Sequence, residues 1–176
     1  MDYRTHPISR KRIRTISKSV RAFFGYGEKD RIDPLRCLDI LLLKKPNISY
    51  EVIKDNKLPD NVAAECKMMP NGGYKISIKE TVYYNAYKGE GASRDHIMHE
   101  ISHVILFLLG YTPLIESAYS NRELDAYESV EWQAKALCGE TMIPYEETDG
   151  MIPDEIIKEY GVSVSQALYR WKMNPK

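Results

Sequence analysis

Two histidines and a glutamate stand at a fixed spacing in the segment His99-Glu100-Ile101-Ser102-His103. The apolar run Val104 to Leu109 continues this segment, which predicts a helix that ends near Gly110. Residues i and i+4 lie on one face of a helix, so both imidazoles can bind the same metal ion. Glu100 then lies beside that ion, where a carboxylate can accept a proton from a water molecule. The spacing therefore predicts a helix that forms part of a metal-dependent hydrolase.

The composition favours one domain without a general preference for nucleic acid or membranes. The chain has 176 residues, enough for one hydrophobic core, and its 25 basic and 25 acidic side chains give a formal net charge of zero. No apolar run has the length of a membrane span, and no secretory signal follows the N-terminus. Cys37, Cys66 and Cys138 are far apart and odd in number, so we expect reduced thiols and a cytoplasmic protein.

Helical spacing predicts two helices in an N-terminal segment, residues 1–45. The first covers about 8–24 and ends near Gly25, and the second is capped by Asp33-Pro34 and ends before Pro46. One face of the first helix is basic and carries Arg10, Lys11, Arg12, Arg14, Lys18 and Arg21. We interpret this face as solvated, with a surface for an acidic partner or for DNA as the alternative.

Residues 46–176 contain the predicted sheet and the remaining helices. Apolar residues alternate with polar ones at 48–52 and at 74–78, which predicts two strands, and the apolar run 82–84 predicts a third. The turn sequence Asn71-Gly72-Gly73 precedes the second of these strands. We therefore expect a small, mostly antiparallel sheet of three strands.

Capping residues divide the rest of the chain into four helices. Ser93 or Asp95 can cap the motif helix, and Asn121 can cap a helix that continues to residue 138. A short helix runs from Pro153 to Gly161, and Ser163 can cap the last one. The expected fold is α+β: one zincin-like domain over residues 1–176, with the histidine motif on a central helix.

A catalytic zinc site needs a third protein ligand and an open position for water. Outside the motif the chain has only His6 and His96, so we expect a carboxylate from the helix at 121–138. The candidates are Asp125, Glu128 and Glu131. All three lie on one flank of that helix, so the spacing alone leaves the choice open.

Four further segments carry a common pattern. They are Lys75-Ile76-Ser77-Ile78, Arg94 ahead of His99, Glu131-x-x-Ala134-x-x-Leu137-Cys138-x-x-Thr141-Met142-Ile143-Pro144, and Tyr160-Gly161-Val162-Ser163 with Ala167 and Tyr169-Arg170. Together with the histidine motif they resemble the ImmA/IrrE-type metallopeptidases over roughly residues 45 to 171. Ser102 stands where that family usually has glycine, a difference that affects local packing and removes no ligand.

The resemblance implies a zinc-dependent endopeptidase whose protein substrate is a helix-turn-helix transcriptional repressor, silencing genes of a mobile element or a stress response. It implies His99, His103 and Glu131 as metal ligands and Glu100 as the catalytic base. Zinc is the default ion, and Mn²⁺ or Fe²⁺ also accept two imidazoles and a carboxylate. We expect the repressor to dock on the basic helix 8–24 and on the strands near the site, where an extended segment can join a sheet edge.

The alternative function is a repressor-binding protein that does not cut, either an anti-repressor or a toxin–antitoxin component with a metal-stabilised fold. Glu100 favours hydrolysis, because a purely structural metal site has no use for a base there. His96 is interpreted as a partly buried residue of the helix start, with a hydrogen bond to a ligand or proton transfer as the alternative. The group that stabilises the oxyanion stays open among Tyr83, Tyr84, Arg94, Tyr111 and Tyr169. No pattern indicates the oligomeric state.

Overall fold

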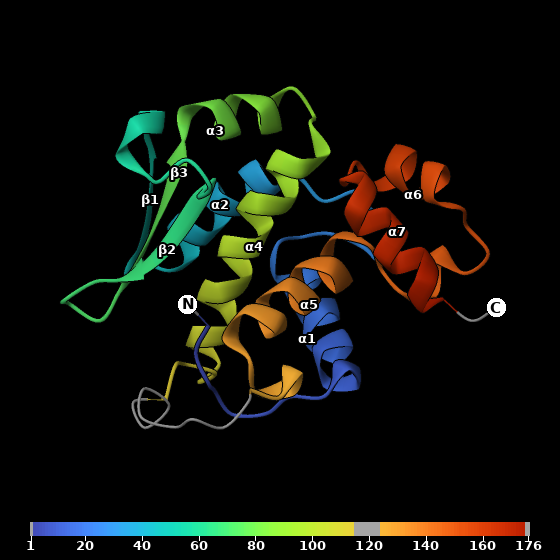
Figure 1. Cartoon of the computed structure of the whole chain (residues 1–176), viewed down its shortest axis with the longest axis horizontal. Helices are drawn as coiled ribbons and strands as arrows, with labels where there is room; N and C mark the ends of the chain where they lie inside the picture. Colours follow the sequence, from blue (N-terminus) through green and yellow to red (C-terminus); the bar gives the residue numbers. More distant parts are fainter. Residues whose placement is uncertain (1, 115–123, 175–176) are drawn as a thin grey trace.

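The computed structural model describes residues 2–114 and 124–174 and has an α+β architecture, as expected (Figure 1). The helices are α1 (Arg10–Phe23), α2 (Pro34–Lys44), α3 (Glu80–Tyr87), α4 (Gly91–Leu108), α5 (Val130–Met142), α6 (Pro153–Tyr160) and α7 (Val164–Met173). The strands are β1 (Ile48–Ile53), β2 (Ala64–Met68) and β3 (Tyr74–Lys79). Short 3-10 helices occur at η1 (Asp55–Lys57), η3 (Ala126–Glu128) and η4 (Glu146–Thr148).

The strand order of the sheet is β1-β3-β2, and its pairing is mixed. β2 and β3 are antiparallel and joined through the predicted Asn71-Gly72 turn, whereas β1 and β3 are parallel. The expectation of a mostly antiparallel sheet is therefore wrong for one of the two pairings. β3 takes the central position because Tyr74, Ile76 and Ile78 form its most apolar face, and all three are buried against the helices.

The third predicted strand is also wrong. Residues 82–84 belong to α3, and the third strand is β2. The run 82–84 has no alternation of apolar and polar residues, and within α3 Ala86 is buried while Tyr84 and Tyr87 are exposed. Residues 82–84 therefore belong to a short helix with one buried face, and not to a strand.

Helix α4 is the centre of the molecule. It packs against β2 and β3 on one side and against α5 on the other, and α2 and α3 also contact it (Figure 1). Ile97, Met98, Ile101 and Val104 have no exposed surface, which fixes the position and rotation of the helix. Any side chain on the remaining face of α4 is thereby held in a defined direction.

The start of α4 differs from the expected one. Its N-cap is Glu90, whose side chain accepts the backbone N–H of Ser93, so Ser93 and Asp95 lie inside the helix instead of capping it. Gly91 is required in the first turn, because a Cβ atom there would lie 2.3 Å from the carbonyl oxygen of Val162. This close approach brings the segment before α7 against the start of α4.

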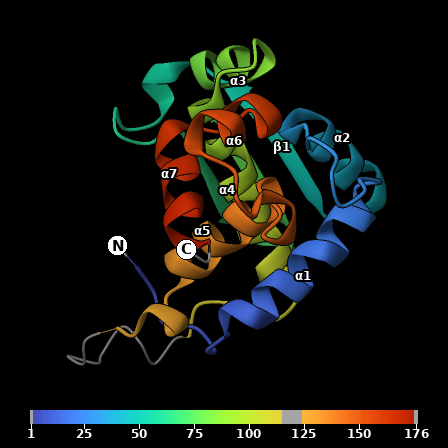
Figure 2. The same cartoon turned by 90° about the vertical axis from the view of Figure 1, so that its right-hand side faces the viewer.

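Helix α5 lies between α1 and α7 (Figure 2). It begins at Val130 with Ser129 as its N-cap, so the expected helix over 121–138 starts too early. Asn121, the expected cap, lies outside the described residues. The other helices agree with their predicted caps: Asp33 caps α2, Ser163 caps α7, and α6 ends at Gly161, which has a positive φ of 63°.

Within residues 2–114 and 124–174, no helix is both long enough and apolar enough to cross a bilayer. All three cysteines are free; Cys37 and Cys138 are buried and Cys66 is half-buried. Unpaired thiols agree with the expectation of reduced cysteines.

Candidate metal centre

The two motif histidines meet on one face of α4. Their Nε2 atoms are 3.0 Å apart, and their rings are almost perpendicular, at 85°. This arrangement follows from the one-turn spacing of His99 and His103 on a helix whose opposite face is fully packed. Burial lowers the pKa of His99, although Glu131 opposes the shift, so the neutral imidazole that can bind a metal is favoured.

Glu131 approaches the same point from the first turn of α5. Its Oε2 is 3.2 Å from Nε2 of His99, and its Oε1 is 3.3 Å from Nε2 of His103. The hydrogen bonds to His103 and His99 hold the pKa of Glu131 far below its usual range, so this carboxylate is anionic at neutral pH. Two nitrogen atoms and a carboxylate therefore converge from two helices.

The spacing of these donor atoms fits a divalent ion. Ligands about 2.0–2.1 Å from a tetrahedral Zn²⁺ lie about 3.3 Å from one another. The three separations between donor residues are 3.0, 3.2 and 3.3 Å. Among the described residues, this is the one group of three or more His, Cys, Asp or Glu side chains whose donor atoms lie close enough together to hold an ion.

The other two carboxylates considered from the sequence lie elsewhere. Glu128 is in η3 and forms an ion pair with Arg4 at 3.4 Å, and Asp125 precedes η3. The predicted shared flank of Asp125, Glu128 and Glu131 is wrong, because α5 starts only after the first two of them.

An N-terminal segment, residues 2–8, holds the start of α5 in place. Asp2 accepts the backbone N–H of Glu131 at 3.2 Å through Oδ1 and the Ser129 hydroxyl at 2.5 Å through Oδ2. The backbone of Tyr3 accepts the N–H of Val130, and Thr5 donates to the carbonyl of Glu128. The sequence contained no motif that signals this role, because contacts across more than 120 positions leave no local pattern.

Glu100 is the remaining polar residue of the motif. It is buried, and this burial is the main reason that its pKa rises to about 7; Glu131 adds to the rise, while His103 and the backbone N–H of Cys66 oppose it. A carboxyl with this pKa can both accept and release a proton near neutral pH.

A large cleft opens over these residues. Its volume is about 1370 Å³, and His99, Glu100, His103 and Glu131 contribute to its lining. One wall is formed by β2 and the residues before it, and the other by α5 and α7. β2 pairs with β3 alone among the described strands, so its outer edge faces this cleft.

Of the five candidates for oxyanion stabilisation, only Tyr169 lines the cleft among the described residues. Arg94 is buried and donates to the carbonyls of Ile32 and Gly161, which makes it a structural residue. Tyr83, Tyr84 and Tyr111 lie outside the cleft lining. Tyr3 also lines the cleft, and the sequence did not indicate it because residues 2–8 show no periodicity.

His96 and Ser102 lie on α4 close to the motif histidines. His96 lines the cleft but is exposed, so the interpretation as a partly buried residue is wrong, and it lies outside the donor cluster. Ser102, at the position where glycine is usual, is buried, and its hydroxyl donates to the Met98 carbonyl at 2.7 Å. The helix therefore accommodates the serine without an unpaired polar group.

The basic face of α1 is only partly solvated. Lys11, Arg12 and Lys18 are exposed, as expected. Arg21 is buried and donates to the carbonyls of Gly27 and Thr141. Arg10, Arg14 and Arg21 contact the protein itself, so this face is not a continuous surface for an acidic partner or DNA.

Two of three comparisons with known proteins found a similarity. The model of peptidase family M78, described as the IrrE N-terminal-like domain, matches residues 61–172. A sequence comparison with curated proteins finds no match. Among solved structures, a Mycobacterium tuberculosis transcriptional regulator is similar, with a TM-score of 0.57 and 16% sequence identity. The similar region covers 90% of this chain and 46% of the regulator, so the chain spans about half the length of that protein.

Proposed function

The chain belongs to the IrrE N-terminal-like domain family of peptidases, and on this premise we propose that it is a zinc-dependent endopeptidase that cleaves a helix-turn-helix repressor. The family expected from the sequence signature is confirmed by the match over residues 61–172. The observation that carries the proposal is the convergence of His99, His103 and Glu131 beside Glu100 at the cleft.

In this proposal, His99, His103 and Glu131 hold the ion. Two imidazoles and one carboxylate are the ligand set of many catalytic zinc sites, and Mn²⁺ or Fe²⁺ are the alternatives. A divalent ion bound there supplies Lewis acidity, which lowers the pKa of water and polarises a peptide carbonyl. Because Glu131 is partly exposed to the cleft, the site stays accessible from one side, as catalysis requires.

Glu100 is the proposed general base. It accepts the proton that water releases on adding to the peptide carbonyl carbon. It then returns this proton to the amine nitrogen as the carbon–nitrogen bond breaks, so that the carboxylate is regenerated. Tyr169 is the candidate donor to the oxyanion, because of the five candidates it alone lines the cleft.

The proposed substrate is an extended protein segment. The outer edge of β2 faces the cleft and offers backbone groups to a strand from another chain. The structural neighbour is described as a transcriptional regulator, which agrees with a substrate in gene control. Three free thiols agree with action in the reducing cytoplasm. We treat residues 1–176 as one metallopeptidase domain, because α1 packs on α5 and residues 2–8 contact the site.

The decisive experiment is incubation of the purified protein and Zn²⁺ with the repressor encoded by a neighbouring regulatory gene. Mass spectrometry should detect two discrete fragments, and a chelator should prevent their formation. The Glu100→Gln variant should bind Zn²⁺ as tightly as the wild type and cleave about 10²- to 10⁴-fold more slowly.

The matched control is Glu146→Gln, which removes a carboxylate that lies outside the cleft lining and should leave cleavage unchanged. If the Glu100→Gln protein cuts the repressor at the wild-type rate, the assigned base is wrong. If the wild type binds the repressor without cutting it, the protein is instead a repressor-binding antagonist.

A further inference from the structure

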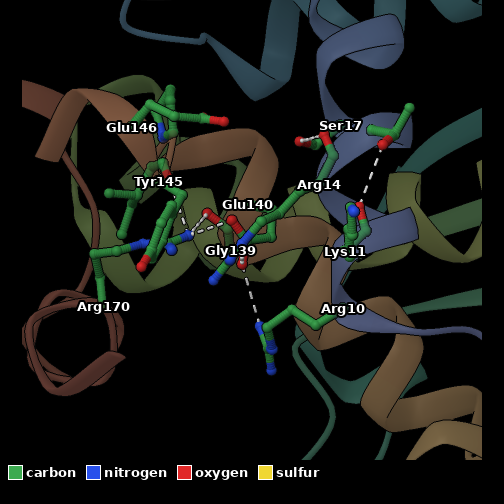
Figure 3. A network of polar contacts seen from close by, with 12 residues as sticks. Arg10, Lys11, Arg14, Ser17, Gly139, Glu140, Tyr145, Glu146 and Arg170 are labelled. Carbon is green, nitrogen blue, oxygen red and sulfur yellow. Dashed lines mark hydrogen bonds and ion pairs between the residues drawn. The ribbon is translucent and has the colours of Figure 1, made fainter. Parts of the chain in front are cut away.

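Positive charge is in excess on the cleft wall formed by α1, α5 and α7. Glu140 of α5 accepts from Arg10 and Arg14, both at 3.3 Å, and from Arg170 at 2.9 Å (Figure 3). The Glu140 side chain is only 1% exposed, so these three guanidinium groups share one buried carboxylate. A single pair already neutralises this carboxylate, and the other two positive charges are therefore uncompensated within the cluster.

Arg10 brings part of this charge to the cleft surface. Its guanidinium carbon lies 5.1 Å from the ring centre of Trp132 and 5.6 Å from that of Tyr169, and all three residues line the cleft. Nη1 donates to Glu140 and Nη2 to the Tyr169 hydroxyl. Among the described residues, these contacts use two of the five N–H donors of the guanidinium. A planar group held between two rings is well suited to bind a carboxylate.

Two more cations belong to the same wall. Lys135 is exposed, lines the cleft and lies one helical turn after Glu131 on the same face of α5. Arg170 also lines the cleft, but its guanidinium is buried and donates to Glu140 and to the carbonyl of Ile143, so it adds positive charge to the wall without being free to bind a ligand.

The acidic residues of the cleft do not cancel this charge. Glu65 forms an ion pair with Lys67 on β2, the opposite wall. Glu131 faces the two imidazoles, and Glu100 is buried beside them. Asp95 accepts the backbone N–H of Ser163 at the start of α7.

We propose that Arg10 and Lys135 form a subsite for an acidic side chain of the substrate. This inference rests on the proposed function and defines its substrate class: peptides with Asp or Glu close to the cleaved bond. Trp132, which stacks with Arg10, directly follows Glu131 in the chain. Because Trp132 adjoins the proposed metal ligand Glu131, we expect the acidic residue to lie close to the cleaved bond.

The test measures peptide binding without cleavage. The Glu100→Gln protein, loaded with Zn²⁺ and immobilised, is incubated with a pool of random nonapeptides that are acetylated and amidated, so that only side chains carry charge. Retained peptides are sequenced by mass spectrometry. We expect Asp and Glu to be enriched about fivefold over the input pool.

Three substitutions in this background locate the preference. Arg10→Gln and Lys135→Gln should each reduce the enrichment to about twofold or less, and Arg10→Lys should retain part of it. Arg12→Gln is the matched control, because Arg12 is exposed on the same helix and lies outside the cleft lining. Arg10→Gln leaves Glu140 paired with Arg14 and Arg170, so we expect the variant to fold. If the Arg10→Gln protein does not fold, Lys135→Gln alone tests the inference.

The inference is overturned if no peptide is retained, if retained peptides match the input in acidic content, or if Lys135→Gln and Arg10→Gln leave the enrichment unchanged. Its failure is distinguishable from that of the proposed function. If acidic peptides are enriched but the wild type does not cleave the repressor, the proposed hydrolase activity is disproved and the subsite is not. If the wild type cleaves the repressor but acidic peptides are not enriched, the subsite is disproved and the proposed hydrolase activity is not.

Discussion

Glu131 and Glu140 stand on the same helix, α5, and have opposite surroundings. The Glu131 side chain is 43% exposed and faces two imidazoles at the cleft. The Glu140 side chain is 1% exposed and accepts from three guanidinium groups of α1 and α7 (Figure 3). Both are glutamates near cationic or potentially cationic side chains, yet only the first has room for another ligand.

The difference shows that the partners of a carboxylate, together with its access to the cleft, indicate its role. Imidazoles can be neutral, so Glu131 can exchange their N–H groups for a metal ion. Guanidinium groups stay charged, so Glu140 cannot leave them without exposing buried charge to an apolar interior. Glu140 is therefore a structural residue that joins α1, α5 and α7, whereas Glu131 is available for function.

The largest effect expected from this comparison concerns Glu140. Glu140→Ala should destabilise the fold by about 3–5 kcal/mol, because Arg170 stays buried without its anion. The free energy of unfolding, measured by urea denaturation, checks this. The control is Glu146→Ala, since Glu146 forms an exposed pair with Lys18 and should change stability little. Equal stabilities of the two variants would contradict a structural role for Glu140.

The next effect concerns Glu131. Glu131→Ala should weaken Zn²⁺ binding by at least about 100-fold, since it removes a ligand, and should leave the metal-free fold almost as stable as the wild type. With free Zn²⁺ at 100 times its Kd, the wild type should gain about 2.7 kcal/mol of stability, most of which the variant should lose. Calorimetric titration and denaturation with and without Zn²⁺ measure both. A Zn²⁺ affinity equal to that of the wild type would remove Glu131 from the site.

A smaller effect concerns the segment that positions Glu131. Asp2→Ala removes the acceptor for the Glu131 backbone N–H and the Ser129 hydroxyl, and should weaken Zn²⁺ binding by up to about tenfold. Asp2→Asn keeps one acceptor oxygen and should weaken binding less. Competition with a chromogenic chelator gives both affinities. If Asp2→Ala binds Zn²⁺ as the wild type does, residues 2–8 have no influence on the ligand.

The last effect concerns a third carboxylate, Asp95, whose pKa is shifted by burial and not by a cationic partner. Burial raises the pKa of Asp95 to about 6, since only one of its oxygens accepts a hydrogen bond, from Ser163, and the other is unpartnered. A carboxyl whose pKa is raised by folding stabilises the fold below its unfolded pKa, and this contribution is lost as the pH rises through about 6.

Between pH 4 and pH 7, the wild type should therefore lose about 1–2 kcal/mol of stability that Asp95→Asn does not lose. Urea denaturation of both proteins at several pH values measures the difference. A constant difference across this range would show that the Asp95 carboxyl is not perturbed by burial.

Local patterns predicted those elements whose signals lie within a few residues. The cap Asp33-Pro34 marked the start of α2, and Gly161 marked the end of α6. The turn at Asn71-Gly72 correctly preceded a strand. In each case one turn of helix or one hairpin contains both the signal and the structure that it specifies.

Predictions failed where contacts between segments far apart in the chain determine the structure. β1 and β3 are parallel neighbours although β2 lies between them in the chain, and no local signal marks this crossover pairing. The start of α5 is set by Ser129 and by residues 2–8, which pair with the segment ahead of the helix. Arg10, Arg14 and Arg21 had the sequence pattern of a solvated face, but α5 and the following segment lie against them.

The sequence by itself determined that two imidazoles and a carboxyl share one turn of helix, because the helical repeat places residues i and i+4 on the same face. It also determined the family, through the signature that continues to residue 171. Only the tertiary structure decided that the Glu131 carboxylate meets both imidazoles, that Asp2 holds its backbone, and that Arg10 borders the cleft. These contacts join segments far apart in the chain, and they depend on how α4, α5, α1 and the N-terminal segment pack around a common core.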